Sequence, residues 1–240
     1  DGKKRILLAV EPNDEKTGIV FRIVANVPAK GGNAAQRREH DKRISLGTLT
    51  QSVARCVFCN SIMTLEDIQV LAQGQEWNSL LFAVVTDGQS GKEYRLPTHF
   101  ENEVANGILQ SACQSGALDS SLSEAISPIR PSPNARGISG LTRYGIKTFR
   151  DVFSVRQQFA MKTFCTCILS LREQMGCEAW ADKISDLLAL AIGHLANRNS
   201  TLCHWDTGRE TISSTFQRYA LRINWDYSEG NPAHDGSGSF

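Results

Sequence analysis

The residues best suited to chemistry are two cysteines with two residues between them, Cys56 and Cys59. This spacing lets both thiolates reach one metal ion through a tight turn, and zinc favours sulfur ligands of this kind. The same spacing also occurs in redox pairs, and both residues could be buried structural cysteines, so three interpretations are open. A zinc site would need further ligands, and the candidates, none at a characteristic spacing, are His40, His99 and Cys113.

The remaining cysteines favour a reducing compartment. The chain has seven cysteines, which is an odd number, and no signal peptide is visible. We therefore expect a cytoplasmic location and no disulfide framework. Outside the Cys56–Cys59 pair, we expect the cysteines to be small buried hydrophobic residues. Cys203 stands beside His204, a thiol next to a base, but neighbouring strand residues point to opposite faces, which favours a structural role.

Basic residues form a second candidate site. Six of them lie in and after a proline-rich stretch, with aromatic residues between them: Arg130, Arg136, Arg143, Lys147, Arg150 and Arg156. Because arginine and lysine neutralise phosphates, Arg136, Arg143, Lys147 and Arg156 are candidates for nucleic-acid contact. The alternative is that they solvate one side of a helix pair. The whole chain has a formal charge of only +1, with 26 basic and 25 acidic residues, and so lacks an overall basic footprint.

Composition and length predict a globular α+β protein. The chain has 240 residues, of which 41% are hydrophobic and 21% charged. We expect a β-rich, truncated zinc-ribbon-like unit over 1–114, a Pro/Ser/Gly-rich connection over 115–140, and a helical unit with a C-terminal strand over 141–240. The longest apolar run is far shorter than the ~20 residues of a membrane-spanning helix, so no membrane partner is expected. Since the chain opens with Asp1, we expect it to belong to a longer protein.

The elements of the first unit follow from local patterns. The β-branched runs Arg5–Val10 and Ile19–Val24 predict one hairpin, and 80–86 with 93–96 predict another. The polar segment Ala29–Arg43 has no periodicity and is predicted to be a solvated loop. Thr64 and Thr98 each precede an acidic residue by three positions, which predicts helices to about 71 and over 99–113.

The second unit is predicted to be helical. Ser154 and Gln157 form a capping pair at the start of a helix that ends near Gly176. A second helix follows from an apolar repeat of period 3.6 that runs to Leu195. Asn197 and Asn199 are placed to close it with a left-handed cap residue, and a strand is expected over Arg218–Asp226.

Several segments together resemble one family, the large adenine-specific DNA methylases that contain a zinc ribbon and occur in phage-defence gene clusters. The similarity is spread over most of the chain in the same order, and the stretches NSTLCHW (199–205) and WDYSEGNP (225–232) are the most specific. The other segments that carry it are Gly47–Cys59, Leu80–Thr98, Tyr144–Phe164 and Leu195–Leu221.

The resemblance implies a role within a larger enzyme. In that family a glycine-rich S-adenosylmethionine motif lies upstream of this region and a DPPY-type catalytic motif lies downstream, and neither occurs in these 240 residues. The resemblance therefore implies a central DNA-recognition or scaffold segment of an adenine-specific methyltransferase, with S-adenosylmethionine bound outside it. Its partners would be DNA and the flanking parts of the polypeptide. Cys56 and Cys59 would be the second knuckle of the ribbon, whose first cysteine pair lies upstream. The alternative is a non-enzymatic nucleic-acid or protein interaction module with a zinc-ribbon-like fold.

Overall fold

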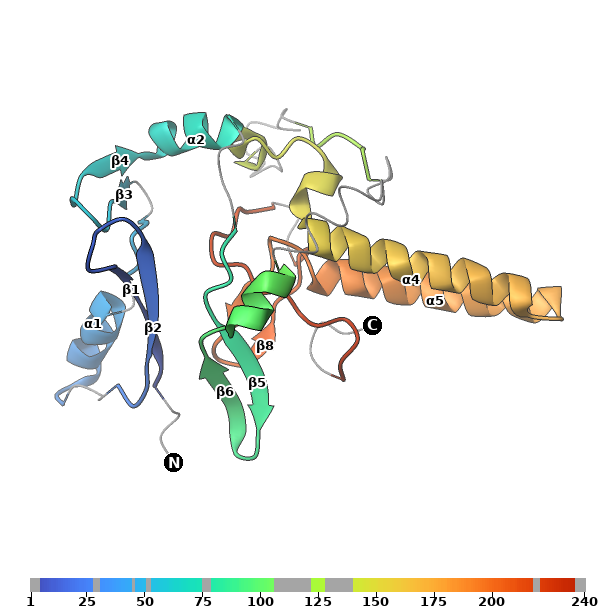
Figure 1. The fold of residues 1–240 in the computed structure, drawn as a ribbon, viewed down its shortest axis with the longest axis horizontal. Coiled ribbons are helices and arrows are strands. Elements are labelled where there is room, and N and C mark those ends of the chain that lie inside the picture. The colour runs from blue at the N-terminus through green and yellow to red at the C-terminus, as the bar shows by residue number, and fades with distance from the viewer. Residues whose placement is uncertain are drawn as a thin grey trace. The chain divides into compact units, whose positions relative to one another are not determined.

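The computed structural model shows an α+β protein, as predicted, with β-hairpins and short helices first and a helical hairpin after them (Figure 1). It describes residues 5–27, 31–44, 46–50, 53–74, 79–105, 122–127, 140–217 and 221–235. The chain divides into two compact units, unit 1 over Asp1–Asn102 and unit 2 over Glu103–Phe240. The boundaries predicted from composition, at 114 and 140, lie among or next to residues outside this description and stay a prediction.

Both predicted hairpins of unit 1 are present. Strand β1 (Leu7–Pro12) pairs antiparallel with β2 (Ile19–Val24), from Leu7 opposite Val24 to Pro12 opposite Ile19. Strand β5 (Val84–Gly88) pairs with β6 (Gly91–Arg95) through a two-residue loop. Gly91 closes that loop at a φ of 115°, which only glycine adopts without strain. The local patterns thus predicted both hairpins but not their bounds, since the strand expected over 80–86 begins only at Val84 and the one expected over 5–10 is Leu7–Pro12.

A third, shorter hairpin surrounds the cysteine pair. Strand β3 (Val53–Arg55) pairs antiparallel with β4 (Ile62–Thr64), with Arg55 opposite Ile62. Helix α2 (Leu65–Gln73) follows at once, and the Thr64 and Asp67 side chains form the predicted reciprocal cap. The helix predicted over 99–113 is present over 99–105, and its remaining residues lie outside the described part. Thr98 and Glu101 cap it as expected, through a bond of 2.7 Å from the Thr98 amide to the Glu101 carboxylate.

The prediction of a solvated loop over 29–43 was wrong for its described part. Helix α1 spans Ala34–Ile44 and begins with a cap in which the Asn33 side chain accepts a 2.9 Å bond from the Gln36 amide. The helix was missed because it contains no buried residue and therefore has no apolar period to detect. Its contact with the first hairpin is polar, an ion pair between Arg5 and Asp41.

Unit 1 has almost no apolar interior. Among its described residues only Ala72 is buried, at 3% exposure. Apolar strand residues such as Ile19, Val20 and Val24 remain more than 40% exposed. The described residues of unit 1 therefore bury little apolar surface, and burial of such surface is the main force that stabilises folded domains.

Unit 2 is built on a helical hairpin. Helices α4 (Val155–Gln174) and α5 (Glu178–Arg198) lie antiparallel along each other (Figure 1). Ser154 and Gln157 form the predicted capping box of α4, and the helix ends two residues before Gly176. Asn199 follows α5 as predicted but has a φ of −139°, so it does not adopt the expected left-handed conformation. Its side chain is used instead for contacts with the C-terminal segment, which are described below.

The apolar core of unit 2 lies where the N-terminus of α4 meets the C-terminus of α5. Leu141, Val152 and Leu195 are completely buried there, next to two 3₁₀ turns at Thr142–Tyr144 and Phe149–Val152. Ile126 also enters this core at 2% exposure. It comes from the stretch predicted to be a connection, and its amide donates a 2.7 Å bond to the Lys147 carbonyl. This part of the connection is therefore packed into the unit.

The chain after α5 contains less regular structure than predicted. Strands β7 (Trp205–Asp206) and β8 (Thr211–Ile212) form a very short hairpin. A strand was expected over 218–226; residues 221–226 form none, and 218–220 lie outside the description. Leu221 is instead buried in the core, so its apolar character reflects packing and not an alternating strand. Across the described helices, none combines the length and apolar character needed to cross a bilayer.

Candidate metal centre

Cys56 and Cys59 lie on the tight turn that joins β3 to β4. The Cys56 amide donates to the Ser61 carbonyl at 2.9 Å, and the Asn60 amide donates back to the Cys56 carbonyl at 3.0 Å. Asn60 has a φ of 59°, a left-handed conformation that asparagine tolerates better than most residues. Backbone bonds at both ends of the turn thus fix the two cysteines on one knuckle, which is how a Cys-x-x-Cys turn presents two thiolates.

Hydrogen bonds within the turn also stabilise the thiolate form of Cys59. The Ser61 side-chain hydroxyl lies 2.9 Å from the Cys59 Sγ atom. Its hydrogen bond lowers the pKa of the Cys59 thiol, with further contributions from the Ser61 backbone and from the neighbouring Cys56 thiol. Cys59 is exposed and Cys56 half-buried, so the interpretation of this pair as buried structural cysteines does not hold. A stabilised thiolate suits both a metal ligand and a redox pair.

We expect replacement of Ser61 by alanine to raise the pKa of Cys59, because the largest stabilising hydrogen bond to its thiolate is removed. The rate of alkylation by iodoacetamide, followed by peptide mass spectrometry between pH 6 and 10, should then rise at a higher pH in Ser61→Ala than in the unchanged chain. The exposed Cys165 on α4 serves as the internal reference, since its profile should not move. An identical Cys59 profile in both chains would show that Ser61 does not tune this thiol.

The described residues supply two ligands and not four. No group of three or more histidine, cysteine, aspartate and glutamate side chains gathers in this part of the chain. His40 faces Asp41 instead, with 3.6 Å between its Nδ1 atom and an Asp41 carboxylate oxygen. His99 is exposed within the helix at 99–105, and Cys113 lies outside the described residues. Within the described residues, the knuckle therefore supplies two of the four ligands of a tetrahedral thiolate site.

Arg143 and Lys147 are both exposed, near the 3₁₀ turns of unit 2. Lys147 immediately precedes the capping residue Thr148, and its backbone amide donates to the Asp151 carboxylate at 2.9 Å. Arg136, the third predicted phosphate ligand, lies outside the described residues. Of the four residues predicted to contact nucleic acid, Arg143 and Lys147 are exposed and remain candidates.

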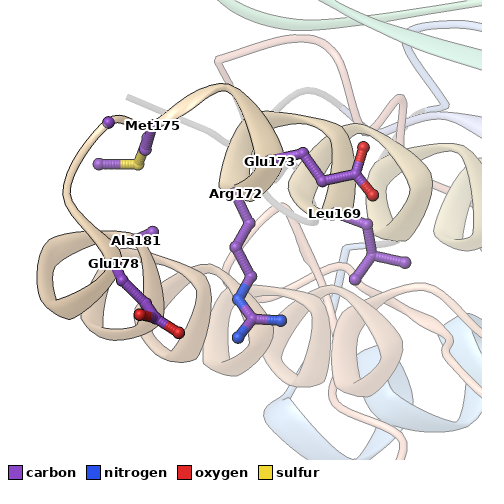
Figure 2. A pocket seen from close by; sticks show the side chains of 7 residues that line it. Leu169, Arg172, Glu173, Met175, Glu178 and Ala181 are labelled. Carbon is purple, nitrogen blue, oxygen red and sulfur yellow. The ribbon is translucent and has the colours of Figure 1, made fainter.

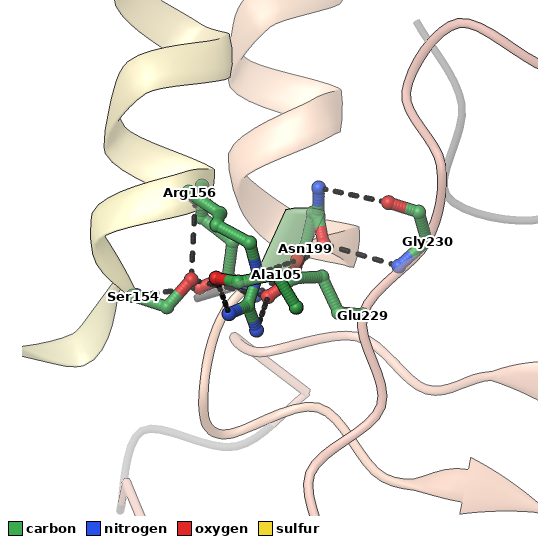
Figure 3. Close-up of polar contacts among 7 residues, drawn as sticks. Ala105, Ser154, Arg156, Asn199, Glu229 and Gly230 are labelled. Atoms are coloured by element: carbon green, nitrogen blue, oxygen red, sulfur yellow. Dashed lines mark hydrogen bonds and ion pairs between the residues drawn. The ribbon is translucent and has the colours of Figure 1, made fainter. Parts of the chain in front are cut away.

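Arg156, the fourth, has a different environment. Its guanidinium is paired with Glu229, with 2.9 Å from Nε to a carboxylate oxygen, and it also donates to the Ala105 carbonyl at 3.1 Å (Figure 3). The Arg156 and Glu229 side chains are only 20% and 25% exposed. The Arg156 charge is therefore paired within unit 2, where it joins the C-terminal segment to α4, and its phosphate contact stays a prediction.

The same network explains the asparagine after α5. Asn199 is 3% exposed and holds the Gly230 backbone by two bonds, from its Nδ2 to the carbonyl at 3.4 Å and to its Oδ1 from the amide at 3.2 Å. Together with the Arg156–Glu229 pair it ties the C-terminal segment to the start of α4 and the end of α5 (Figure 3). These contacts join residues about 30 and 70 positions apart, so no local pattern could have indicated them.

Cys203 and His204 are not arranged as a nucleophile and its base. The Cys203 thiol is completely buried, 3.3 Å from the Thr215 hydroxyl. The His204 ring is held elsewhere, with its Nδ1 atom 2.8 Å from the Ser213 hydroxyl. By contrast, Cys165, Cys167 and Cys177 are exposed, so the expectation that the scattered cysteines are buried was wrong for these three. Residues two apart on a helix point in different directions, which keeps Cys165 and Cys167 from chelating together.

A cavity of about 330 Å³ lies where α4 turns into α5 (Figure 2). Leu169, Met175 and Ala181 form its apolar side and Glu173 and Glu178 carry its charge. Arg172 also lines it, but its guanidinium is bound to Asp182 at 2.7 Å. The cavity contains no residue of the predicted sites, so it adds nothing to the cysteine knuckle.

The comparisons with known proteins give no relative for this chain. Protein-family models, curated proteins and solved structures were all compared with it, and none matches.

Proposed function

We propose that this chain is the central DNA-recognition or scaffold segment of an S-adenosylmethionine-dependent, adenine-specific DNA methyltransferase of the phage-defence type. In this proposal Cys56 and Cys59 supply two of the four thiolates of a zinc ribbon, and the cofactor-binding and catalytic motifs belong to other parts of the polypeptide. The protein acts in the cytoplasm, with DNA and its own flanking regions as partners. The observation that carries the proposal is the knuckle itself, a Cys-x-x-Cys turn between two antiparallel strands.

Two further observations support it. Unit 1 buries only Ala72 among its described residues, and a unit without an interior is the kind that a structural metal ion stabilises. The segments that resemble the methylase family lie in both units, and the most specific of them contain the Asn199 and Glu229 contacts that organise unit 2. When bound, zinc would supply a rigid cross-link, while Ser61 and the backbone of the turn hold the two thiols toward one point.

The test uses both the chain and its coding sequence. The 240-residue chain is expected to transfer no methyl group from S-adenosylmethionine to adenine in duplex DNA. The reason is that we can assign no residue in it that would align the cofactor with the flipped base. The coding sequence on either side is expected to contain a glycine-rich motif upstream and a DPPY-type motif downstream. Turnover by the chain alone would contradict the placement of the chemistry.

A second candidate function is a free-standing nucleic-acid or protein interaction module with a zinc-ribbon-like fold. It is favoured by one observation, that no glycine-rich cofactor loop or DPPY-type motif occurs among the 240 residues. Flanking coding sequence without either motif would select this module over the methyltransferase.

A further inference from the structure

Helix α1 carries a concentration of positive charge that the composition of the whole chain conceals. Four of the 26 basic residues and two of the 25 acidic residues lie in its eleven positions, so the rest of the chain carries one negative charge more than positive. We define the basic face of α1 by its four exposed basic residues, Arg37, Arg38, Lys42 and Arg43. The formal charge of +1 of the whole molecule is therefore due to this helix.

One of the two acidic residues of α1, Asp41, already has a basic partner outside the helix and does not offset the charge of the basic face. Asp41 is paired with Arg5, next to the first hairpin, and that pairing lowers the pKa of the Asp41 carboxyl. The half-buried residues of the helix are His40, Asp41 and Ile44, and they mark the side of α1 that faces the rest of unit 1. Glu39 is the one acid left among the exposed positions of α1.

The helix has little intrinsic reason to be stable. It is eleven residues long, buries none of them, and is polar on all sides. Isolated helices shorter than ~12 residues are marginal in water, and a helix without an apolar face gains nothing from packing. The basic residues of α1 are therefore not held in place by apolar packing, which leaves their long side chains at the surface.

We propose that the basic face of α1 binds the phosphate backbone of double-stranded DNA. This inference rests on the proposed function and deepens it by locating the contact in unit 1. Residues four apart on a helix lie about 5–6 Å from each other, so Arg38 and Lys42 can reach neighbouring phosphates of one strand with their long side chains. Arginine pairs with phosphate through two parallel hydrogen bonds. Contacts of this kind position a protein on DNA without reading its sequence.

The first experiment measures binding of a fluorescent duplex of about 20 base pairs to the 240-residue chain, by anisotropy, at salt concentrations between about 50 and 200 mM. The variant R38E/R43E reverses two charges of the basic face. We expect its affinity at low salt to fall by at least about tenfold, and its slope of log K against log salt to be shallower by about 2, because each lost phosphate contact removes about 0.9. The loss should be the same for duplexes of unrelated sequence.

Two further variants keep this result interpretable. R38Q/R43Q removes the charges but keeps residues of good helix propensity, so a loss of binding in this variant does not arise from an unfolded α1. K162E/K183E makes the same charge change on exposed positions of α4 and α5 and should bind almost as the unchanged chain does. Circular dichroism of all variants should be alike.

Each outcome separates the two proposals. If the unchanged chain binds DNA and the α1 variants bind equally well, or the K162E/K183E variant loses as much, the assignment to α1 is wrong and the proposed function stands. If the unchanged chain does not bind the duplex at all, both the α1 assignment and the DNA-recognition role fall. If poly-L-glutamate binds the basic face as tightly as the duplex does, an acidic protein replaces DNA as the partner.

Discussion

Replacing Cys56 and Cys59 together by serine is expected to abolish the binding of a soft divalent metal ion to this chain. Their thiolates are the two sulfur ligands that the β3–β4 turn brings together, and serine hydroxyls do not replace thiolates on such ions. Titration of the unchanged chain with Cd²⁺, followed by ultraviolet thiolate-to-metal absorption, should show about two thiolates per ion. The double variant should show no such absorption.

A matched control separates this site from the other thiols. Cys165 and Cys167 are also two close cysteines, both exposed, but they lie on helix α4 and point in different directions. The variant C165S/C167S should therefore bind Cd²⁺ as the unchanged chain does. Binding in both should weaken as the pH falls, because protons compete with the metal for the thiolates. Metal binding that survives in C56S/C59S, or that is lost in C165S/C167S, would contradict the knuckle as the metal centre.

The largest effect on stability is expected from the core of unit 2. Leu195 on α5 is completely buried among the apolar residues between the two helices and the 3₁₀ turns. Its replacement by alanine removes buried methyl groups and leaves a cavity, which lowers the free energy of unfolding by about 2–5 kcal/mol. Since domains of this size are stable by only about 5–15 kcal/mol, Leu195→Ala should remove a large part of the stability of unit 2.

The same helix provides the control for this prediction. Leu190 is 72% exposed on α5, so Leu190→Ala makes the same chemical change without a cavity and should alter stability by less than about 0.5 kcal/mol. Denaturation in urea, followed by circular dichroism, compares the two variants with the unchanged chain. Equal losses in both variants would mean that Leu195 is not at the centre of the core.

Local sequence patterns were sufficient where the local chain determines its own structure. Ser154 and Gln157 indicated the start of α4 because a capping box is complete within four residues. The β-branched runs of β1 and β2 likewise predicted the first hairpin. The turn at Cys56 and Cys59 was identified from its spacing alone, although the flanking strands β3 and β4, at three residues each, were too short to show an alternating pattern.

Prediction from sequence was wrong where the decisive contacts are distant or where no apolar pattern exists. Helix α1 has no buried face, so the test for periodicity could not find it. The ion pair of Arg156 with Glu229, 73 residues away, is a distant contact that the neighbouring residues do not indicate, and the nucleic-acid contact of Arg156 stays a prediction. The exposure of Cys165 and Cys167 similarly depends on which face of α4 the neighbouring helix covers, which the residue type does not determine.

The measurement that tests the account most directly is the N6-methyladenine content of genomic DNA, determined by mass spectrometry in cells with and without the gene that encodes this chain. If the chain is the central segment of an adenine-specific DNA methyltransferase, deletion of the gene should remove N6-methyladenine at one sequence motif, and reintroduction of the gene should restore it. Unchanged N6-methyladenine at every motif after deletion would contradict the proposed function.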